Sequence, residues 1–408
     1  MKCRFCETQV TRSFVDLGLQ PLSNAYVARE SIARMEPFYP LHAYVCDRCL
    51  LVQVPELESA ERIFSDYAYL SSMSDSWLDH CRRYAHRMID AMGLSGNSLV
   101  VEVASNDGYL LRFFKEKGVP VLGIEPAANV ASIAEAAGIP TLARFFGTVL
   151  AEELARAGRQ ADLLVGNNVL AHVPNLNDFV GGLAKVLAPT GVLTMEFPHL
   201  GRLLQDKQFD TIYHEHFSYF SFGTVERVFA AHGIELFDVE QLPTHGGSLR
   251  VYGRHATHPQ REVSKRIGDL RAQEQADGTL SIDAYARFAE DVREVKRKLL
   301  AFLIESKREG KTIVAYGAAA KGNTLLNYCG IREDFIDYVV DRSPLKQGKL
   351  LPGSHIPIYE PDRIRETRPD YILILPWNLK DELAAQLSFV REWGGRLVVP
   401  IPEVSLLA

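Results

Sequence analysis

The sequence has few cysteines, no excess of positive charge and no long apolar run. Its 408 residues include six cysteines, too few for a disulfide scaffold in a chain of this length. The 45 Lys and Arg residues stand against 51 Asp and Glu residues, and a net charge of −6 argues against the cationic surface that nucleic-acid binding requires. We therefore expect a small-molecule partner and no nucleic acid.

No apolar stretch approaches the roughly 18 residues that span a bilayer. The first residues, Met1-Lys2-Cys3-Arg4, also lack the apolar region of a secretory signal. We expect a cytoplasmic monomer without a membrane partner. Because the chain is longer than the ~250–300 residues at which single cores stop growing, we also expect several domains.

Two cysteine pairs, Cys3-x-x-Cys6 and Cys46-x-x-Cys49, form the strongest motif. They supply the four thiolates of a tetrahedral, structural zinc site. Four unrelated buried cysteines are the alternative interpretation, and the paired spacing favours zinc. Residues 1–57 include few that could build an apolar core, so something other than burial should hold this segment. Because four thiolates leave zinc no open position for a substrate, we expect an architectural metal.

Strand and helix patterns alternate along most of the remaining chain, which predicts parallel sheets wrapped by helices. The first β-rich segments are 99–104, 121–125, 162–169 and 191–197, followed by a predicted antiparallel hairpin at 235–242 and 248–252. The apolar spacing predicts a long helix at 280–307. A second, smaller α/β unit follows, with strands at 312–316, 335–340, 371–375 and 396–399.

The turn after the first strand predicts a ligand site. Small residues between Ala104 and Gly108 allow close approach to the backbone at the carboxyl end of a strand, where open α/β sheets bind ligands. Glu125 ends the next strand, where an acid can accept hydrogen bonds from both hydroxyls of a ribose, although it could merely cap the following helix. Together these features predict an adenosine-containing ligand. The absence of a G-x-G-x-x-G turn favours S-adenosylmethionine over NAD.

Histidines mark a second candidate site. Asn168 and His172 follow a predicted strand and should lie at the same edge of the sheet. Tyr213, Glu215 and His216 place a base beside an orienting acid, which suits proton abstraction. Structural histidines, or a second metal at the His-x-His pair, are the alternatives.

The ordered set of motifs resembles the zinc-containing, S-adenosylmethionine-dependent sugar C-methyltransferases that act on dTDP-4-keto-deoxysugars, as in tetronitrose biosynthesis. The resemblance covers essentially the whole chain. It is carried by the double Cys-x-x-Cys, Glu102-Val-Ala-Ser-Asn-Asp-Gly108, Asn168-Val-Leu-Ala-His172-Val-Pro174, Tyr213-His-Glu215-His216, Thr244-His-Gly-Gly-Ser-Leu-Arg250 and Gly317-Ala-Ala-Ala-Lys321-Gly-Asn323.

The resemblance implies an α/β fold class with a central Rossmann-like class I methyltransferase domain and a smaller C-terminal Rossmann-like α/β domain. The predicted segments are 1–60, a zinc-binding module; 61–98, a helical connector; 99–257, the S-adenosylmethionine-binding methyltransferase domain; 258–308, linking helices; and 309–408, a C-terminal α/β domain that contributes to sugar-nucleotide binding.

The resemblance also implies methylation of C-3 of a dTDP-linked 4-keto-6-deoxy sugar, a step of deoxysugar biosynthesis. His216 would remove the C-3 proton, since a neutral imidazole accepts a proton near pH 7. Glu215 and Tyr213 would orient the sugar and its developing charge. His172 would help to bind the sugar or relay a proton, and Tyr67 would close the site from the N-terminal side.

The same resemblance implies the binding residues. In the cofactor site Glu125 would hold the ribose and Phe146 would flank adenine, with Ser105, Asn106, Gly108 and Asn168 nearby. The nucleotide would lie between the two α/β units. The substrate-binding residues would be His245, Arg250 and Lys321 near its phosphates, Asn323, and Trp377 near the base or sugar. Lys321 lies in a Gly-rich strand-to-helix turn whose free amides attract phosphate. The alternative interpretation is that this segment is a plain tight turn without a ligand.

Two other functions stay open. An O- or N-methyltransferase would need no enolate, and the Tyr213, Glu215 and His216 cluster argues against it. A non-catalytic zinc- and nucleotide-binding module would need neither a base nor a ribose acid, although the sequence offers both.

Overall fold

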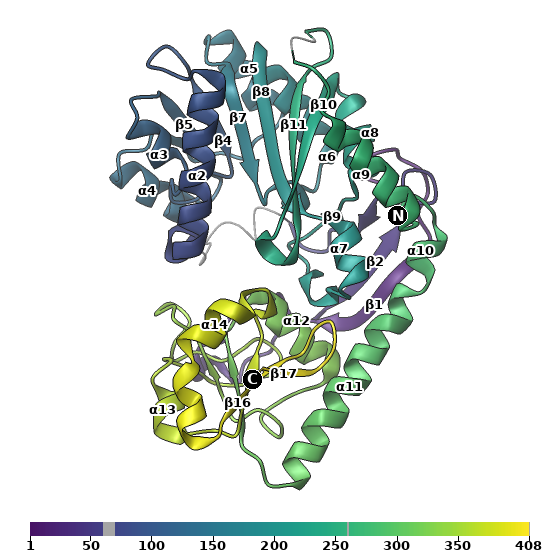
Figure 1. Cartoon of the computed structure of the whole chain (residues 1–408), viewed down its shortest axis with the longest axis vertical. Coiled ribbons are helices and arrows are strands. Elements are labelled where there is room, and N and C mark those ends of the chain that lie inside the picture. The colour runs from purple at the N-terminus through teal and green to yellow at the C-terminus, as the bar shows by residue number, and fades with distance from the viewer. Residues whose placement is uncertain (60–69, 259–260, 408) are drawn as a thin grey trace.

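The computed structural model of the chain describes residues 1–59, 70–258 and 261–407. A central and a C-terminal α/β unit lie one above the other, and helix α11 (Phe288–Arg308) descends along one side beside the N-terminal strands (Figure 1). No helix in the described ranges is both long and apolar enough to cross a membrane.

The N-terminal sheet has the order β1-β2-β3-β9, and its last strand comes from far along the chain. Its strands are β1 (Arg12–Gln20), β2 (Tyr39–Val45), β3 (Val52–Gln53) and β9 (Ser218–Tyr219), all paired antiparallel. The buried face of β1 packs on α11, where the rings of Phe14 and Phe288 stack with centroids 4.6 Å apart. The expectation that burial does not hold this segment is therefore wrong, because its apolar residues pack against a distant helix.

The central unit is a seven-stranded sheet with the order β10-β11-β8-β7-β4-β5-β6. Strand β11 runs antiparallel to both of its neighbours, and the other strand pairs are parallel. The strands are β4 (Val100–Val103), β5 (Val121–Ile124), β6 (Thr141–Leu142), β7 (Ala161–Asn167), β8 (Leu187–Pro198), β10 (Ile234–Leu242) and β11 (Ser248–His255). Because β4 lies between β5 and β7, the loops that follow these strands meet at one edge of the sheet, where such folds bind ligands.

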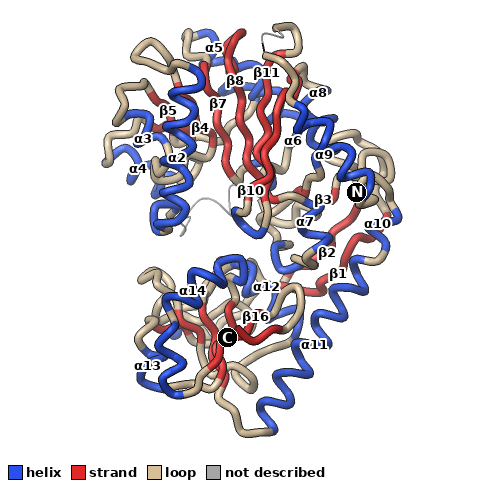
Figure 2. The backbone as a smooth tube through the Cα atoms, in the orientation of Figure 1, coloured by secondary structure: helices blue, strands red, loops and turns tan. Residues whose placement is uncertain are grey.

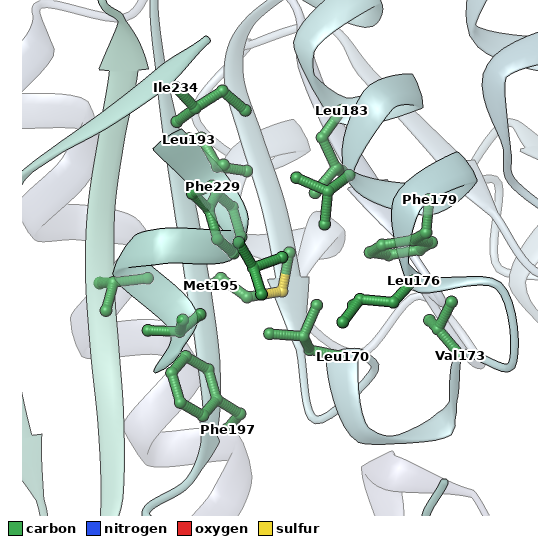
Figure 3. Close-up of a cluster of buried hydrophobic side chains, with 14 of the residues drawn as sticks. Leu170, Val173, Leu176, Phe179, Leu183, Leu193, Met195, Phe197, Phe229 and Ile234 are labelled. Atoms are coloured by element: carbon green, nitrogen blue, oxygen red, sulfur yellow. The ribbon is translucent and has the colours of Figure 1, made fainter. Parts of the chain in front are cut away.

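Helices cover both faces of this sheet (Figure 2). They are α2 (Asp75–Met92), α3 (Leu111–Lys115), α4 (Ala128–Ala136), α5 (Thr148–Arg156), α6 (Leu176–Val186), α8 (Phe222–Ala230) and α9 (Lys265–Ala276). Helix α7 (Leu200–Gln205) lies instead beside the N-terminal sheet, in the same core cluster (Figure 1). The side chains of Leu183, Met195 and Phe229 meet in the core between α6, β8 and α8 (Figure 3). Short 3-10 helices carry several candidate site residues: η3 (Leu170–His172), η4 (Phe209–Thr211), η5 (Thr244–Gly246) and η6 (Trp377–Leu379).

The C-terminal unit is a six-stranded sheet with the order β14-β13-β12-β15-β16-β17, parallel except for β17. Its strands are β12 (Ile313–Tyr316), β13 (Val339–Val340), β14 (Ile358–Tyr359), β15 (Tyr371–Ile374), β16 (Arg396–Val399) and β17 (Ser405–Leu407). Its helices are α12 (Ala320–Cys329), α13 (Arg363–Thr367) and α14 (Lys380–Gln386).

The predicted α/β fold class is confirmed, with the expected central and C-terminal Rossmann-like sheets both present. The predicted helix at 280–307 is divided into α10 (Asp283–Ala286) and α11. The short strands β14 and β17 form the two opposite edges of the C-terminal sheet, and neither was predicted. The exact segment boundaries stay predictions.

Candidate active site

The four predicted metal ligands lie together near the N-terminus. The sulfur atoms of Cys3, Cys6, Cys46 and Cys49 all lie within 4.8 Å of one another, and the Cys3–Cys49 and Cys6–Cys46 Sγ···Sγ distances are both 3.5 Å. Tetrahedral zinc with Zn–S bonds of about 2.3 Å requires sulfur separations of roughly 3.8 Å. The donor set therefore fits zinc, and its thiolates leave no position for a substrate.

Each Cys-x-x-Cys pair forms the same turn. The amide of Glu7 donates to the carbonyl of Cys3 at 3.1 Å, and the amide of Leu50 donates to that of Cys46 at 2.9 Å. Glu7 and Leu50, which follow the second cysteine of each pair, both have a left-handed backbone, with φ of 58° and 60°. Two matching turns thus bring the four sulfurs to one point.

His216 and Tyr213 form the centre of the candidate catalytic site. Nδ1 of His216 lies 2.9 Å from the Thr211 carbonyl oxygen, which can only accept, so Nδ1 carries the proton of the neutral ring. Nε2 then has the free lone pair and accepts from the Tyr213 hydroxyl at 2.9 Å. Burial lowers the pKa of His216 well below its ordinary value, and nearby His172 lowers it further. At neutral pH this ring is an unprotonated base.

His172 lies beside His216, with ring centroids 4.6 Å apart in a T-shaped contact. Its Nδ1 donates to the Glu215 carbonyl oxygen at 2.8 Å. Burial lowers the pKa of His172 to about 4. The flanking residues Leu170 and Val173 belong to the core drawn in Figure 3, so η3 is anchored on both sides of the histidine.

Glu215 is buried, and its carboxylate has a partner that the sequence did not indicate. The side-chain amide of Asn24 donates to Glu215 Oε1 at 2.7 Å. Burial raises the pKa of Glu215 to about 7, and the hydrogen bond from Asn24 opposes this rise. Two residues further on, the Tyr26 hydroxyl donates to the Ala318 carbonyl at 2.6 Å, so this N-terminal loop joins both α/β units. No motif or periodicity marks Asn24, and no sequence signal could have found it.

The loop after β4 and the end of β5 form the candidate cofactor site. The Glu125 carboxylate accepts from the amides of Asn106 at 3.0 Å and Ala127 at 2.9 Å, so it holds the loop and also caps α4. Within the described structure, Asp107 Oδ1 and Asn168 Oδ1 are buried and have no hydrogen-bond partner. Such orphaned acceptors fit a polar ligand that donates to them.

The other predicted cofactor residues pack against the protein itself. Gly108 has a φ of 77°, and a Cβ there would lie 2.9 Å from Ile139 Cγ1, so protein packing already requires this glycine. Ser105 is buried against Gly123. Phe146 is half-buried, with its ring 5.5 Å from that of Phe179 in a T-shaped contact.

Asn168 and His245 form a strained pair. Nδ2 of Asn168 donates to Nε2 of His245 at 3.0 Å, and both residues have left-handed backbones, with φ of 53° and 54°. Backbone strain of this kind persists where the surrounding structure fixes a functional geometry. Burial lowers the pKa of His245 to about 4, so this ring is also neutral.

The C-terminal unit contacts the segment that carries His216 through the side chains of Lys321, Trp377 and Asp210. Nζ of Lys321 lies 4.6 Å from the centroid of the Trp377 ring and donates to Asn378 Oδ1 at 2.6 Å. Trp377 Nε1 donates to Asp210 Oδ2 at 2.7 Å. Burial raises the pKa of Asp210 to about 6, and the charge of Lys321 opposes this rise. Asp210 was not predicted from the sequence, although it lies close ahead of Tyr213.

The remaining predicted residues have different surroundings. Arg250 is 3% exposed and pairs with Glu196 at 2.5 Å inside the central unit, so its charge is already compensated. Burial opposes ionisation of Glu196, but His80 and Arg250 lower its pKa to about 2. Asn323 is buried in α12. Tyr67 lies outside the described residues.

Comparison with known proteins identifies the class. Residues 3–64 match the family model "Putative zinc binding domain", residues 76–239 match "Methyltransferase domain" and residues 243–402 match "C-methyltransferase C-terminal domain". The C-methyltransferase NovU of Streptomyces niveus is 35% identical over 407 residues, which cover 100% of this chain and 97% of NovU. The chain belongs to the C-methyltransferase family. It is an S-adenosylmethionine-dependent methyltransferase with an N-terminal zinc-binding domain, as the sequence predicted.

More distant relatives match smaller parts. A ubiquinone biosynthesis O-methyltransferase of Bartonella tribocorum is 28% identical over 98 residues, which cover 24% of this chain and 40% of that protein. Among solved structures, the PH0226 protein of Pyrococcus horikoshii gives a TM-score of 0.38 at 14% identity, over 49% of this chain and 99% of that one. Magnesium protoporphyrin IX methyltransferase of Synechocystis gives a TM-score of 0.35 at 14% identity, over 47% of this chain and 91% of that one.

Proposed function

We propose that the protein methylates C-3 of a dTDP-linked 4-keto-6-deoxy sugar after removing the proton from that carbon. The observation that carries this proposal is a buried, neutral His216 beside a second neutral histidine and a tyrosine hydroxyl. Methyl transfer to oxygen or nitrogen uses an existing lone pair. A carbon next to a ketone becomes nucleophilic only when a base takes its proton, and His216 has the protonation state for that task.

In the proposed reaction, Nε2 of His216 takes the C-3 proton, and the electrons of that C–H bond move toward the C-4 carbonyl oxygen. Because the single lone pair of Nε2 accepts from the Tyr213 hydroxyl in this structure, that hydroxyl has to turn away before Nε2 takes the proton. The Tyr213 hydroxyl is then able to donate to the developing oxyanion. When bound, S-adenosylmethionine supplies the methyl group to C-3 and leaves as S-adenosylhomocysteine.

Binding of the two ligands would use both α/β units. Glu125, Asn106, Asp107 and Asn168 would hold the cofactor, because they surround the carboxyl ends of β4, β5 and β7 and include two orphaned acceptors. For the diphosphate of the sugar nucleotide we assign Lys321, at the start of α12, because Arg250 is already paired with Glu196.

The test uses the zinc-loaded protein, methyl-labelled S-adenosylmethionine and dTDP-4-keto-6-deoxy sugars with either a 3-amino or a 3-hydroxy group. A dTDP-sugar without the ketone is the control. We expect label at carbon only in the keto sugars, and transfer to the control or to no sugar at all would refute the proposal. In deuterium oxide without the methyl donor, the wild type should exchange the C-3 proton, and His216→Asn should not.

A further inference from the structure

We propose that Arg4, which lies between the cysteines of the first pair, is a positioning residue for the two histidines. Through it the zinc site would act on the chemistry as well as on the fold. The inference rests on the proposed roles of His216 and His172.

The guanidinium of Arg4 bridges the two backbone segments that carry these histidines. Its Nε donates to the Pro174 carbonyl, two residues after His172, and its Nη1 donates to the Phe217 carbonyl, directly after His216, both at 3.1 Å. The guanidinium carbon also lies 5.2 Å from the centroid of the Phe217 ring. A planar fork of donors fixes two acceptors at a set separation, which a single ammonium group cannot do.

The same two segments are also joined directly. The Phe217 amide donates to the Ala171 carbonyl at 2.7 Å, and Nδ1 of His172 donates to the Glu215 carbonyl at 2.8 Å. The contact between the two imidazole rings therefore depends on how these backbones are held, and Arg4 connects them on the side of the zinc module.

Arg4 is itself held by the metal site. Its amide donates to Gln53 Oε1 at 3.1 Å, and Nε2 of the same glutamine donates to Cys3 Sγ at 3.4 Å. The Asn177 side chain also donates to the Arg4 carbonyl at 3.3 Å. Hydrogen bonds thus run from a zinc ligand to both histidine segments.

The test compares Arg4→Gln and Arg4→Lys with Arg48→Gln. Arg48 is an exposed arginine between the cysteines of the second pair, which makes it a matched control. Zinc content, S-adenosylmethionine affinity and the ring ¹⁵N–¹H signals of His172 and His216 are measured without any sugar. These readouts stay informative if the proposed substrate is wrong. Assignment of the ring signals uses His172→Asn and His216→Asn.

We expect Arg4→Gln to keep about one zinc per chain but to shift or broaden both histidine signals. With the keto sugar, kcat should fall by about 10- to 100-fold with little change in KM, because small misplacement of a base is costly. Arg4→Lys should fall between this variant and the wild type, and Arg48→Gln should match the wild type.

Unchanged ring signals and kcat would overturn the proposal. Zinc loss in both Arg4 variants would overturn it too, since Arg4 would then serve the metal. If Arg4→Gln does not fold, Arg4→Lys decides by the same signals.

Discussion

The side-chain amide of Asn24 donates a 2.7 Å hydrogen bond to Oε1 of Glu215, across 191 positions of the sequence. The bond favours the charged carboxylate, whereas burial favours the neutral acid. The larger effect is burial, and the pKa of Glu215 is therefore raised to about 7. A residue of the N-terminal module thus opposes the effect of burial on the pKa of a candidate catalytic residue in the central unit.

Replacing Asn24 by Leu should raise the pKa of Glu215 further, because the donor to the carboxylate is lost. A carboxyl group whose pKa is raised by folding adds stability that is lost as pH rises from its ordinary value of 4.5 to the folded value. In the wild type this loss should end near pH 7, and in Asn24→Leu it should extend above pH 7. Urea unfolding across this pH range measures the effect. Replacing Glu215 by Gln in both the wild type and Asn24→Leu separates the titration of Glu215 from that of the histidines. The lowered pKa values of the histidines act in the opposite direction, because they make stability fall as pH falls. Identical pH dependence in the two backgrounds would contradict the assignment.

Replacing His216 by Asn should lower kcat by about 10²- to 10⁴-fold, the usual contribution of a general base. The affinity for S-adenosylmethionine should not change. His172→Asn should cost less, since His172 contacts the base without being the base. Single-turnover rates with the keto sugar measure both, and equal losses in the two variants would argue that the histidines act as one unit.

The pH profile gives an independent check on His216. Its pKa is lowered well below the ordinary value of 6.5, so the base should stay unprotonated as pH falls through 6.5. We therefore expect kcat/KM to show no loss of base function between pH 7 and 6. A drop centred near 6.5 would indicate a solvent-exposed histidine and count against this site. Measurement of the wild type beside Glu215→Gln separates the titration of the carboxyl group.

Removal of zinc should disrupt the sheet that holds β9, because β3 pairs with β9 and follows the second cysteine pair. Cys46→Ser should lose metal, become less stable and lose exchange of the C-3 proton. The control is Cys329→Ser, because Cys329 is a buried thiol outside the cluster, and this variant should still bind zinc. Metal analysis, thermal unfolding and proton exchange give the three readouts. A folded, zinc-free Cys46→Ser with full exchange would show that the metal is dispensable.

Arg250→Met should destabilise the protein by about 3–5 kcal/mol, because it leaves Glu196 buried without its cation. Adding Glu196→Gln should recover part of this loss. The pair formed by exposed Arg271 and partly buried Glu226 provides the control, since Arg271→Met should cost less than ~1 kcal/mol. Denaturant unfolding of the three variants and the wild type measures these differences, and similar losses at the two arginines would contradict the assignment.

Local signals explain which parts the sequence predicted. The spacing of the cysteines and the β-rich run at 99–104 depend on neighbours in the chain. The structure brings the four cysteines together and places β4 (Val100–Val103) within that run. The sequence placed His172 and His216 in separate motifs, but it could not give the ring contact or the proton on Nδ1.

Residues that matter through distant partners could not be found in this way. Asn24 and Arg4 donate hydrogen bonds to groups 170 to 213 positions away, and nothing in their neighbourhood indicates those partners. Arg250 stands in a recognisable motif, yet its partner Glu196 becomes evident only when β11 pairs with β8. The family resemblance implies that Arg250 lies near the phosphates, and the structure adds a buried ion pair with Glu196 that the sequence did not indicate.

Lys321 provides the last prediction, because its charge depends on Asp210. Burial lowers the pKa of Lys321, and the carboxylate of Asp210 opposes this effect. Lys321→Gln should weaken binding of the dTDP-sugar by about 10- to 100-fold, the value of a hydrogen bond from a charged donor. The exposed Lys298→Gln should leave binding unchanged.

Asp210→Asn tests the same relationship without removing the lysine. Loss of the carboxylate should lower the pKa of Lys321 further, so the ammonium would lose its proton at lower pH than in the wild type. We therefore expect the affinity for dTDP to weaken at lower pH in Asp210→Asn, as followed by calorimetry from pH 7 to 10. If affinity in this variant follows the wild type across the whole range, then Asp210 does not control the charge of Lys321. If Lys321→Gln binds dTDP normally, the phosphates are held elsewhere.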